Sequence, residues 1–384
     1  MELFEYIGQT EIINKIKSHI TSGRVSHAYI FCGSPGMGKR TLAHLFAGAL
    51  LCESTGKGMY TGGAEEGATY AGGTMGAVGA VEGATYAGGA VNAVSAVERA
   101  TYAGCAACGK CVPCRLFESG SNPDIRVISS AQKSISVDEI RGAVDWLYIR
   151  PSYSEWKVYI IEEADKMTVQ AQNAILKTLE EPPPYAIAIL TLANPQSLLD
   201  TVRSRCVMYN FSRYSEWEVD QILRRQMKKN AIDDSNVPLS GLYSRIADGV
   251  PGRGIELMKS EGFLELREHA IGLLQRHIEG DPVAFVRMVD FLGKSKDAFD
   301  KISKILIYWL RDMWLYEMHG SDCVLINIDK KSIIKSLRGK CRIHDMLDCI
   351  MEIENTGMAI AANANYSLAI NVMLLKISSL RRQG

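Results

Sequence analysis

The chain lacks an excess of charge of either sign. Its 43 basic residues balance its 43 acidic residues, so no net field draws it toward nucleic acid or an anionic membrane surface. Any contact with DNA must then be local or shared with partners. The chain also lacks an apolar run near the ~20 residues of a membrane span, and residues 1–5 show neither the basic nor the apolar segment of a secretory signal. We therefore expect a soluble, cytoplasmic protein with no membrane contact.

Disulfides are not expected either, although the chain has ten cysteines, because a reducing cytosol favours metal ligation or burial of thiols. Four of them form the run Cys105-x2-Cys108-x2-Cys111-x2-Cys114. Pairs spaced C-x2-C let two thiolates meet one metal ion across a tight turn, and structural zinc takes four such ligands. An iron–sulfur cluster is the alternative, but Arg115 follows where ferredoxin motifs continue differently.

The secondary-structure signals change along the 384 residues. Up to residue 212 strand-like and helix-like segments alternate, which predicts a mostly parallel sheet with helices on both faces. The expected strands are 28–32, 125–128, 158–162, 187–192 and 207–211, and the expected helices are 39–51, 137–147 and 169–180, with a short turn around 198–202. Ser136 and Glu139 form a capping box for the second of these helices.

Strand signals largely vanish beyond residue 214. The expected helices are 216–229, 239–246 and 253–259, followed by the longer stretches 284–292, 300–315 and 368–380. A turn is expected at Gly249-Val250-Pro251-Gly252, between two of the shorter helices. This pattern predicts a small helical domain and then a separate helical bundle.

A repeat interrupts the first part of the chain. From residue 61 to 104 the composition collapses to Gly, Ala, Val, Thr and Tyr, and the run at 67–72 returns at 83–88 and 99–104, sixteen residues apart each time. This is a tandem duplication. Its units carry few bulky side chains and bury too little surface to offset the entropy of ordering, so we expect disorder or loose helix, with 91–97 transiently helical.

A phosphate-binding loop follows the first expected strand, with the sequence GSPGMGK at residues 33–39. Its glycines and lysine are Gly33, Gly36, Gly38 and Lys39. The pattern should continue with Ser or Thr, whose hydroxyl ligates Mg²⁺, but Arg40 stands there. Thr41 comes one residue late, which turns it by roughly 100° around a helix.

The strand expected at 158–162 carries the second nucleotide signal. Glu162 stands where hydrolytic phosphate-loop proteins place an Asp for Mg²⁺, and Glu163 stands where they place a Glu that activates water. Together with Arg40, the longer Glu162 side chain weakens the case for a competent Mg²⁺ site. The sequence thus indicates a nucleotide-binding fold and argues against nucleotide hydrolysis.

Two further motifs carry a family resemblance: AILKTLEEPP at 174–183 and RSRC at 203–206. They resemble the bacterial clamp-loader branch of the AAA+ ATPases, and within it the delta-prime subunits of DNA polymerase III, with the gamma/tau subunits as the related alternative. The likeness covers essentially the whole chain except the repeat, including NANYSL at 363–368 before an apolar helix. It implies an α/β AAA+ parallel-sheet domain with a zinc module, a helical lid and an all-α collar.

The resemblance also implies domain bounds and a zinc-ligand set. The expected parts are a nucleotide-binding-like domain at 1–212, with the repeat insertion at 53–104 and the zinc module at 105–115, a lid at 213–263 and a collar or oligomerisation domain at 264–384. The implied ligands are Cys52, Cys108, Cys111 and Cys114. Cys105 is then surplus, and the sequence leaves open whether it replaces Cys52.

By the same resemblance, Arg205 of the Ser204-Arg205-Cys206 motif acts in trans, as an arginine finger on ATP held by a neighbouring subunit. Leu192 and Gly252 occupy the family's sensor positions, so four nucleotide-handling positions deviate when Arg40 and Glu162 are included. ATP binding stays open, and a catalytic site in this chain is not expected.

The implied partners are gamma/tau and delta subunits in a hetero-oligomeric ring, and the sliding clamp and primed DNA through that complex. The chain would thus be part of the DNA-directed DNA polymerase holoenzyme, a nucleotidyltransferase complex. The alternatives are an ATP-hydrolysing gamma/tau-like subunit and a zinc-stabilised AAA+-like adaptor outside replication.

Overall fold

The computed structural model describes residues 6–56, 107–129, 134–229 and 237–380. They belong to two compact units, Met1–Tyr214 and Ser215–Gly384. The boundary expected after residue 212 lies two residues from this division. The expectations for residues 61–104, including the helix at 91–97, and for Cys105 fall outside the described residues.

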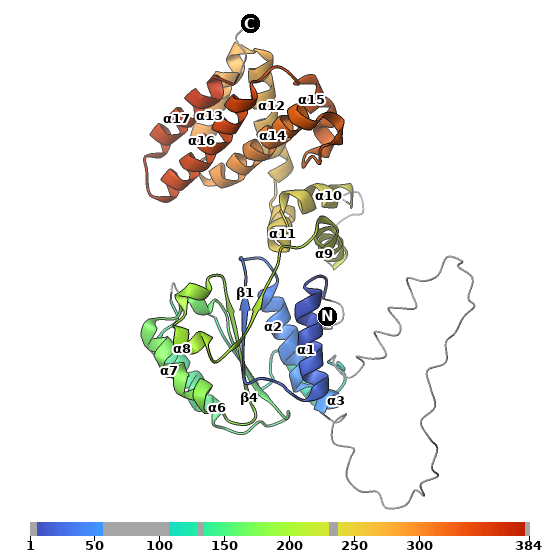
Figure 1. Ribbon diagram of the computed structural model, residues 1–384, viewed down its shortest axis with the longest axis vertical. Coiled ribbons are helices and arrows are strands. Elements are labelled where there is room, and N and C mark those ends of the chain that lie inside the picture. Colours follow the sequence, from blue (N-terminus) through green and yellow to red (C-terminus); the bar gives the residue numbers. More distant parts are fainter. Residues whose placement is uncertain (1–5, 57–106, 130–133, 230–236, 381–384) are drawn as a thin grey trace, which may run out of the picture. The chain divides into compact units, whose positions relative to one another are not determined.

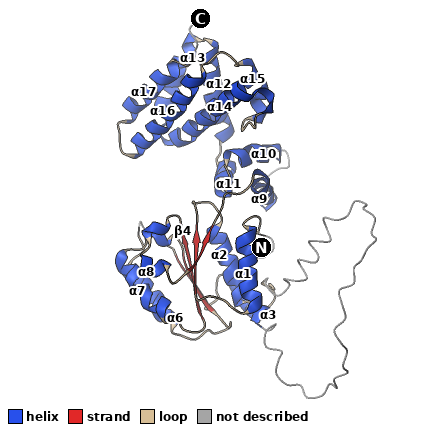
Figure 2. Cartoon of the chain, viewed as in Figure 1, coloured by secondary structure: helices blue, strands red, loops and turns tan. Residues whose placement is uncertain are grey.

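The first unit is built on a parallel five-stranded sheet, whose strands are red in Figure 2. The strand order is β2-β3-β4-β1-β5. The strands are β1 (Ala28–Cys32), β2 (Ile125–Ile128), β3 (Lys157–Ile161), β4 (Ala186–Leu192) and β5 (Val207–Asn210). In the register of the sheet, Tyr29 of β1 lies between Ile189 of β4 and Val207 of β5. The prediction of a parallel α/β core is confirmed.

The three inner strands β1, β3 and β4 are buried along their whole length. Their apolar runs without alternation are what a sheet covered on both faces requires. The side chains of β1 nevertheless divide between the two faces. Ala28 and Ile30 belong to the same apolar cluster as Ile140 and Ile175 of the later helices, whereas the ring of Tyr29 packs edge-on against Phe46, with centroids 5.0 Å apart.

Figure 1 shows helices on both faces of this sheet, with α6, α7 and α8 on one side and α1 and α2 on the other. The helices of the first unit are α1 (Thr10–Ser22), α2 (Lys39–Leu51), α3 (Glu53–Gly56), α5 (Val112–Glu118), α6 (Val137–Leu147), α7 (Val169–Glu180) and α8 (Asp200–Arg203). The predicted capping box of α6 is present, with Ser136 and Glu139 satisfying each other's backbone N–H groups. The sequence interpretation missed α1, whose Ile12, Ile16 and Ile20 form a buried stripe at helical spacing.

The second unit is helical throughout its described residues. Its α-helices are α9 (Glu216–Lys229), α10 (Val237–Ile246), α11 (Pro251–Lys259), α12 (Phe263–Glu279), α13 (Pro282–Lys294), α14 (Phe299–His319), α15 (Lys331–Ser336), α16 (Ile343–Ala361) and α17 (Tyr366–Ser378). Helices α9, α10 and α11 pack on one another, while α14 packs on α12 and α16, and α17 packs on α13 and α16. The division into a lid and a collar stays a prediction. Within the described ranges, no helix combines the length and apolarity needed to cross a bilayer.

The turn expected at residues 249–252 is shorter than predicted. Helix α11 already begins at Pro251, because proline is tolerated in the first helical turn, where its missing N–H has no intrahelical partner to lose. Gly249, with φ of 72°, makes the turn.

Candidate functional site

The phosphate-binding loop joins β1 to α2, as the strand, loop and helix pattern predicts. Gly36 and Gly38 have φ of 83° and 81°, a left-handed region that favours glycine. Gly38 is the N-cap of α2. A Cβ atom on Gly38 would lie 2.4 Å from the hydroxyl oxygen of Tyr6, so the close approach of that tyrosine also requires glycine here.

Two tyrosine hydroxyls hold the backbone of this loop. Tyr6 Oη donates to the carbonyl oxygen of Gly38 at 3.1 Å, and Tyr214 Oη donates to that of Met37 at 3.0 Å. The hydroxyl oxygens are 2.8 Å apart. Burial, with a smaller contribution from Tyr214, raises the pKa of Tyr6 well above its ordinary value. Sequence reasoning missed both tyrosines, because neither belongs to the motif and they are far apart along the chain.

Lys39 turns back onto its own loop. Its Nζ donates to the carbonyl oxygens of Gly33 and Ser34, the latter at 2.8 Å. Burial lowers the pKa of the Lys39 ammonium, against the opposing negative charges of Asp165 and Glu163 nearby. In this arrangement Lys39 donates hydrogen bonds to carbonyl groups of its own loop, where the motif would place a phosphate.

Arg40 and Glu162, the two deviating residues of the nucleotide motifs, contact each other. Arg40 Nε lies 2.7 Å from Glu162 Oε1, and the Glu162 side chain is only 7% exposed. His44 Nε2 lies 3.1 Å from the same oxygen. Sequence reasoning missed His44, although its position four residues after Arg40 places both on one face of α2. Thr41, on the same first turn, is exposed.

Glu163, expected at the water-activating position, is engaged locally. Its backbone is left-handed, with φ of 52°, and its N–H donates to Thr191 Oγ1 at 3.2 Å. Its carboxylate pairs with Lys166 at 2.6 Å. Thr191 is the polar side chain at the end of β4 that sequence reasoning overlooked.

The sensor position after Thr191 is apolar, as the sequence says. Leu192 is 1% exposed, and its carbonyl oxygen accepts the N–H of Gly33 at 3.2 Å. Asn194, two residues beyond Leu192, accepts the N–H of Gln196 at 3.0 Å and so caps a single turn of 3-10 helix. Gly252 is the second residue of α11, in the other unit.

Arg205 lies just beyond α8 and contacts the end of α7. Its Nη2 is 2.8 Å from Glu180 Oε1, and its Nη1 donates to the carbonyl oxygen of Thr201 at 2.8 Å. The Arg205 side chain remains 34% exposed. Glu180 belongs to the first of the two motifs that carry the family resemblance, so these contacts join both motifs in space.

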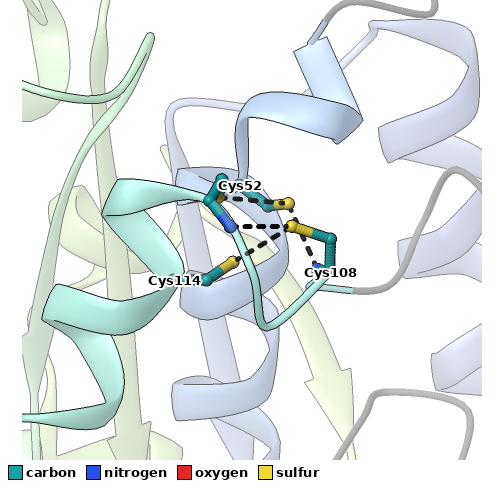
Figure 3. Close-up of side chains that lie close together, drawn as sticks. Cys52, Cys108 and Cys114 are labelled. Atoms are coloured by element: carbon teal, nitrogen blue, oxygen red, sulfur yellow. Dashed lines mark hydrogen bonds between the residues drawn. The ribbon is translucent and has the colours of Figure 1, made fainter.

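Four cysteines meet at the opposite end of α2. Cys52 directly follows this helix, Cys111 is the N-cap of α5, and Cys114 lies within α5. Together with Cys108, their sulfur atoms all lie within 4.8 Å of one another, and Figure 3 shows three of the side chains pointing toward one another.

The spacing of the sulfur atoms fits one tetrahedral metal ion. The separations between the sulfurs of Cys52 and Cys111 and between those of Cys108 and Cys114 are both 4.0 Å. Zinc–sulfur bonds of about 2.3 Å give a tetrahedral edge of roughly 3.8 Å. This donor set of four thiols closes the site on all sides, which is typical of a structural ion.

Backbone donors prepare part of the cluster for a cation. N–H groups of Lys110 and Cys111 lower the pKa of Cys108 to about 6. Burial would raise the pKa of Cys52, but donors from Ser54 and the Cys108 backbone outweigh it. Burial raises the pKa of Cys114, so a bound cation is what would favour its thiolate.

The segments that carry the cysteines are packed tightly against the sheet domain. An added Cβ on Gly48 of α2 would lie 3.1 Å from the Phe117 ring of α5. The buried Asn122 amide donates to the carbonyl oxygen of Pro113 at 3.0 Å. The approach of Phe117 to Gly48 places α5 beside α2, and the Asn122 amide ties the start of α5 to the segment that follows this helix.

Comparisons with known proteins show the family to which the chain belongs. The sequence profile described as "DNA polymerase III, delta subunit" matches residues 8–81 and 85–215, more than half of the chain. The chain belongs to this family. The resemblance inferred from the sequence motifs is thereby confirmed.

Individual relatives differ in how much of their length this chain matches. The DNA polymerase III subunit gamma of Buchnera aphidicola (subspecies Schizaphis graminum) is 28% identical over 71% of this chain and 59% of its own. The chain thus spans about three fifths of that relative's length. Subunit delta' of Pseudomonas aeruginosa is 24% identical over 94% of each chain. A solved gamma subunit-related protein from Thermotoga maritima is 20% identical over 70% of this chain and 89% of that one, with a TM-score of 0.33.

Proposed function

We propose that this chain is a delta-prime-type subunit of the DNA polymerase III clamp loader. It helps load the sliding clamp onto primed DNA within the polymerase holoenzyme, as a AAA+ member that does not hydrolyse ATP itself. Its match to a delta' subunit spans 94% of both chains, whereas its match to a gamma subunit spans 59% of the latter. The observation that carries the absence of hydrolysis is the contact between Arg40 and Glu162.

The direct functional contribution is assigned to Arg205. The carbonyl of Thr201 and the carboxylate of Glu180 fix the direction of its guanidinium while leaving it partly exposed. In the assembled ring, Arg205 exchanges the Glu180 carboxylate for the charge that develops on ATP in a neighbouring subunit. A guanidinium at that place stabilises the transition state of phosphoryl transfer.

The four-cysteine cluster supports a structural zinc ion. Cys52, Cys108, Cys111 and Cys114 would hold it, and the ion would supply charge that keeps the thiolates ionised. Its place in the function is to fasten α5 to the end of α2. An iron–sulfur cluster remains the alternative for the same four thiols.

An apolar face on α17 supports assembly with other subunits. Leu368, Val372 and Leu375 follow one another at helical spacing and are 66%, 49% and 68% exposed. The other face of the same helix is buried, with Met373 and Ile377 at 0% exposure. A helix that is apolar on both faces is typical of one covered on both, and the collars of gamma/tau and delta subunits are the proposed cover.

Reconstitution with gamma/tau and delta subunits tests the proposed function. Arg205→Ala is expected to lower the DNA-stimulated ATP turnover of the loader several-fold while assembly persists, because only the finger is removed. Leu375→Asp is expected to weaken assembly instead. Arg203→Ala is the matched control, because Arg203 lies two residues before Arg205 and pairs with Asp200; it should leave turnover unchanged. Unchanged turnover in assembled Arg205→Ala would contradict the finger.

A gamma/tau-like ATPase is the second candidate, favoured by the retained Lys39 and by the 28% identity to a gamma subunit. It requires the purified chain to hydrolyse ATP with DNA stimulation and to lose that activity in Lys39→Ala. The third candidate, an adaptor outside replication, requires that the chain fail to co-purify with gamma/tau and delta.

A further inference from the structure

We propose that the guanidinium of Arg40 takes the place of the divalent metal ion at the phosphate-binding loop, so that this site excludes Mg²⁺ whether or not a nucleotide is bound. The inference rests on the proposed function in treating the loop as an altered nucleotide site. It goes further by naming what replaces the ion and which residues determine the change.

The first argument is positional. A phosphate loop of this pattern binds Mg²⁺ through the hydroxyl that follows its lysine and through an acid at the end of a neighbouring strand. Arg40 occupies the first of these positions and Glu162 the second. Both ligand positions are therefore filled by residues of opposite charge, on α2 and directly after β3.

The second argument is the distance between the two side chains. An octahedral Mg²⁺ ion needs each ligand oxygen at about 2.1 Å, with the ion between the ligands. Arg40 Nε and Glu162 Oε1 instead form a direct ion pair at 2.7 Å. No ion fits between atoms at hydrogen-bond distance, and a cation placed beside Arg40 would meet a fixed like charge.

The third argument is that Glu162 is already satisfied. Its side chain is 7% exposed, and the same oxygen that contacts Arg40 also lies 3.1 Å from His44 Nε2. Exposed ion pairs contribute little, but removing one partner of a largely buried carboxylate leaves a charge without compensation. The Glu162 carboxylate thus depends on Arg40 as it would otherwise depend on an ion.

The fourth argument comes from Lys39. Its ammonium contacts the carbonyl oxygens of Gly33 and Ser34. The two cations of the motif are therefore both committed to protein oxygens, Lys39 within the loop and Arg40 across to Glu162. The first turn of α2 is joined to the end of β3 by protein atoms alone, the connection that a bound metal ion would otherwise make.

The test measures binding of ADP to the full chain by calorimetry, with Mg²⁺ and with a chelator in its place. The variants are Arg40→Thr/Glu162→Asp, which rebuilds both metal-ligand positions, and Arg141→Thr, the same arginine substitution at an exposed helical pair with Asp138. We expect less than a twofold effect of Mg²⁺ on the wild type and on Arg141→Thr. In the double variant Mg²⁺ should strengthen ADP binding at least tenfold.

Each outcome decides the proposal. A wild type that binds ADP in neither condition, beside a double variant that binds it only with Mg²⁺, supports the proposal. Tenfold tighter binding with Mg²⁺ in the wild type overturns it, and so does a double variant that keeps its thermal unfolding transition but shows no Mg²⁺ effect. Failure here leaves the turnover experiment on Arg205 untouched, and failure of that experiment leaves the Mg²⁺ comparison untouched.

Discussion

The two ends of helix α2 differ in how the ionisable side chains gathered there are compensated. At its N-terminus, Arg40 contacts the Glu162 carboxylate, and protein atoms supply both signs of charge. At its C-terminus, Cys52 joins three other thiols whose sulfurs lie within 4.8 Å of one another, with no protein cation among these four groups.

This difference between the two ends of α2 shows which residues a metal site requires. The cysteine end has four thiol groups close enough to hold one metal ion. The phosphate-loop end has an acid at one ligand position and a fixed cation at the other, so the acid is neutralised without an ion. At the phosphate-loop end, one arginine in place of a hydroxyl-bearing residue replaces a metal ligand with a cation.

The largest expected effect is on the cysteine end. Cys114→Ser should abolish retention of zinc and lower the free energy of unfolding by on the order of 4 kcal/mol, because loss of a structural metal is among the few changes of that size. Metal analysis and denaturant unfolding of the purified chain measure both quantities.

Cys341→Ser is the matched control, because Cys341 and Cys114 are both 4% exposed. The control should keep its zinc. Equal zinc content in Cys114→Ser and the wild type would mean that the two ends of α2 do not differ as described here.

A smaller effect is expected at the phosphate-loop end. Tyr6→Phe removes the hydroxyl that donates to the Gly38 carbonyl, which should cost about 1 kcal/mol of unfolding free energy. The pH dependence has a defined sign. Because burial raises the pKa of Tyr6 above its ordinary value of 10.0, the folded state keeps a proton that the unfolded chain releases, and stability falls as pH rises above 10.

Denaturant unfolding between pH 8 and about pH 11 measures this loss. Tyr6→Phe should reduce the alkaline slope without removing it, since burial also raises the pKa of Tyr29 and Tyr159. Tyr148→Phe, at a residue that is 52% exposed, serves as the control. The same slope in Tyr6→Phe and the wild type would argue against a buried hydroxyl on the loop.

The smallest effect is expected from shortening the repeat. Cys52 and Cys108 enclose residues 53–107, which are 55 residues, and deleting 67–98 leaves 23. Because the sequence predicts little order in the repeat, closure entropy should favour the shorter chain by roughly 0.8 kcal/mol. Thermal unfolding of the zinc-loaded protein measures the change. A loss of several kcal/mol would mean that the repeat carries stabilising structure.

Much of the sheet domain could be predicted because its signals are local. Helices α2, α6 and α7 begin and end at the predicted residues, since a phosphate loop, a capping box and a proline run mark their ends. The side-chain contacts at the phosphate-binding loop are harder to predict from the sequence. The sequence indicates Arg40 and Glu162 separately, but their contact depends on strand order, which local patterns do not contain.

Long-range contacts explain the other omissions. Tyr6 and Tyr214 contact the loop from positions 208 residues apart, and no periodicity relates them. The grouping of Cys52 with the C-x2-C cluster came from the family resemblance, because spacing alone left five thiols competing for four positions. The salt bridge between Arg205 and Glu180 joins residues that are 25 positions apart, and no local pattern relates them.

The approach of the Cys108 N–H to within 3.3 Å of Cys52 Sγ has a consequence for how the gene can vary. The described residues stop at Gly56 and resume at residue 107, and the contact between Cys52 and Cys108 brackets this interval. Slippage during copying of the tandem units can therefore add or remove sixteen-residue copies without changing the separation that the remaining structure must span.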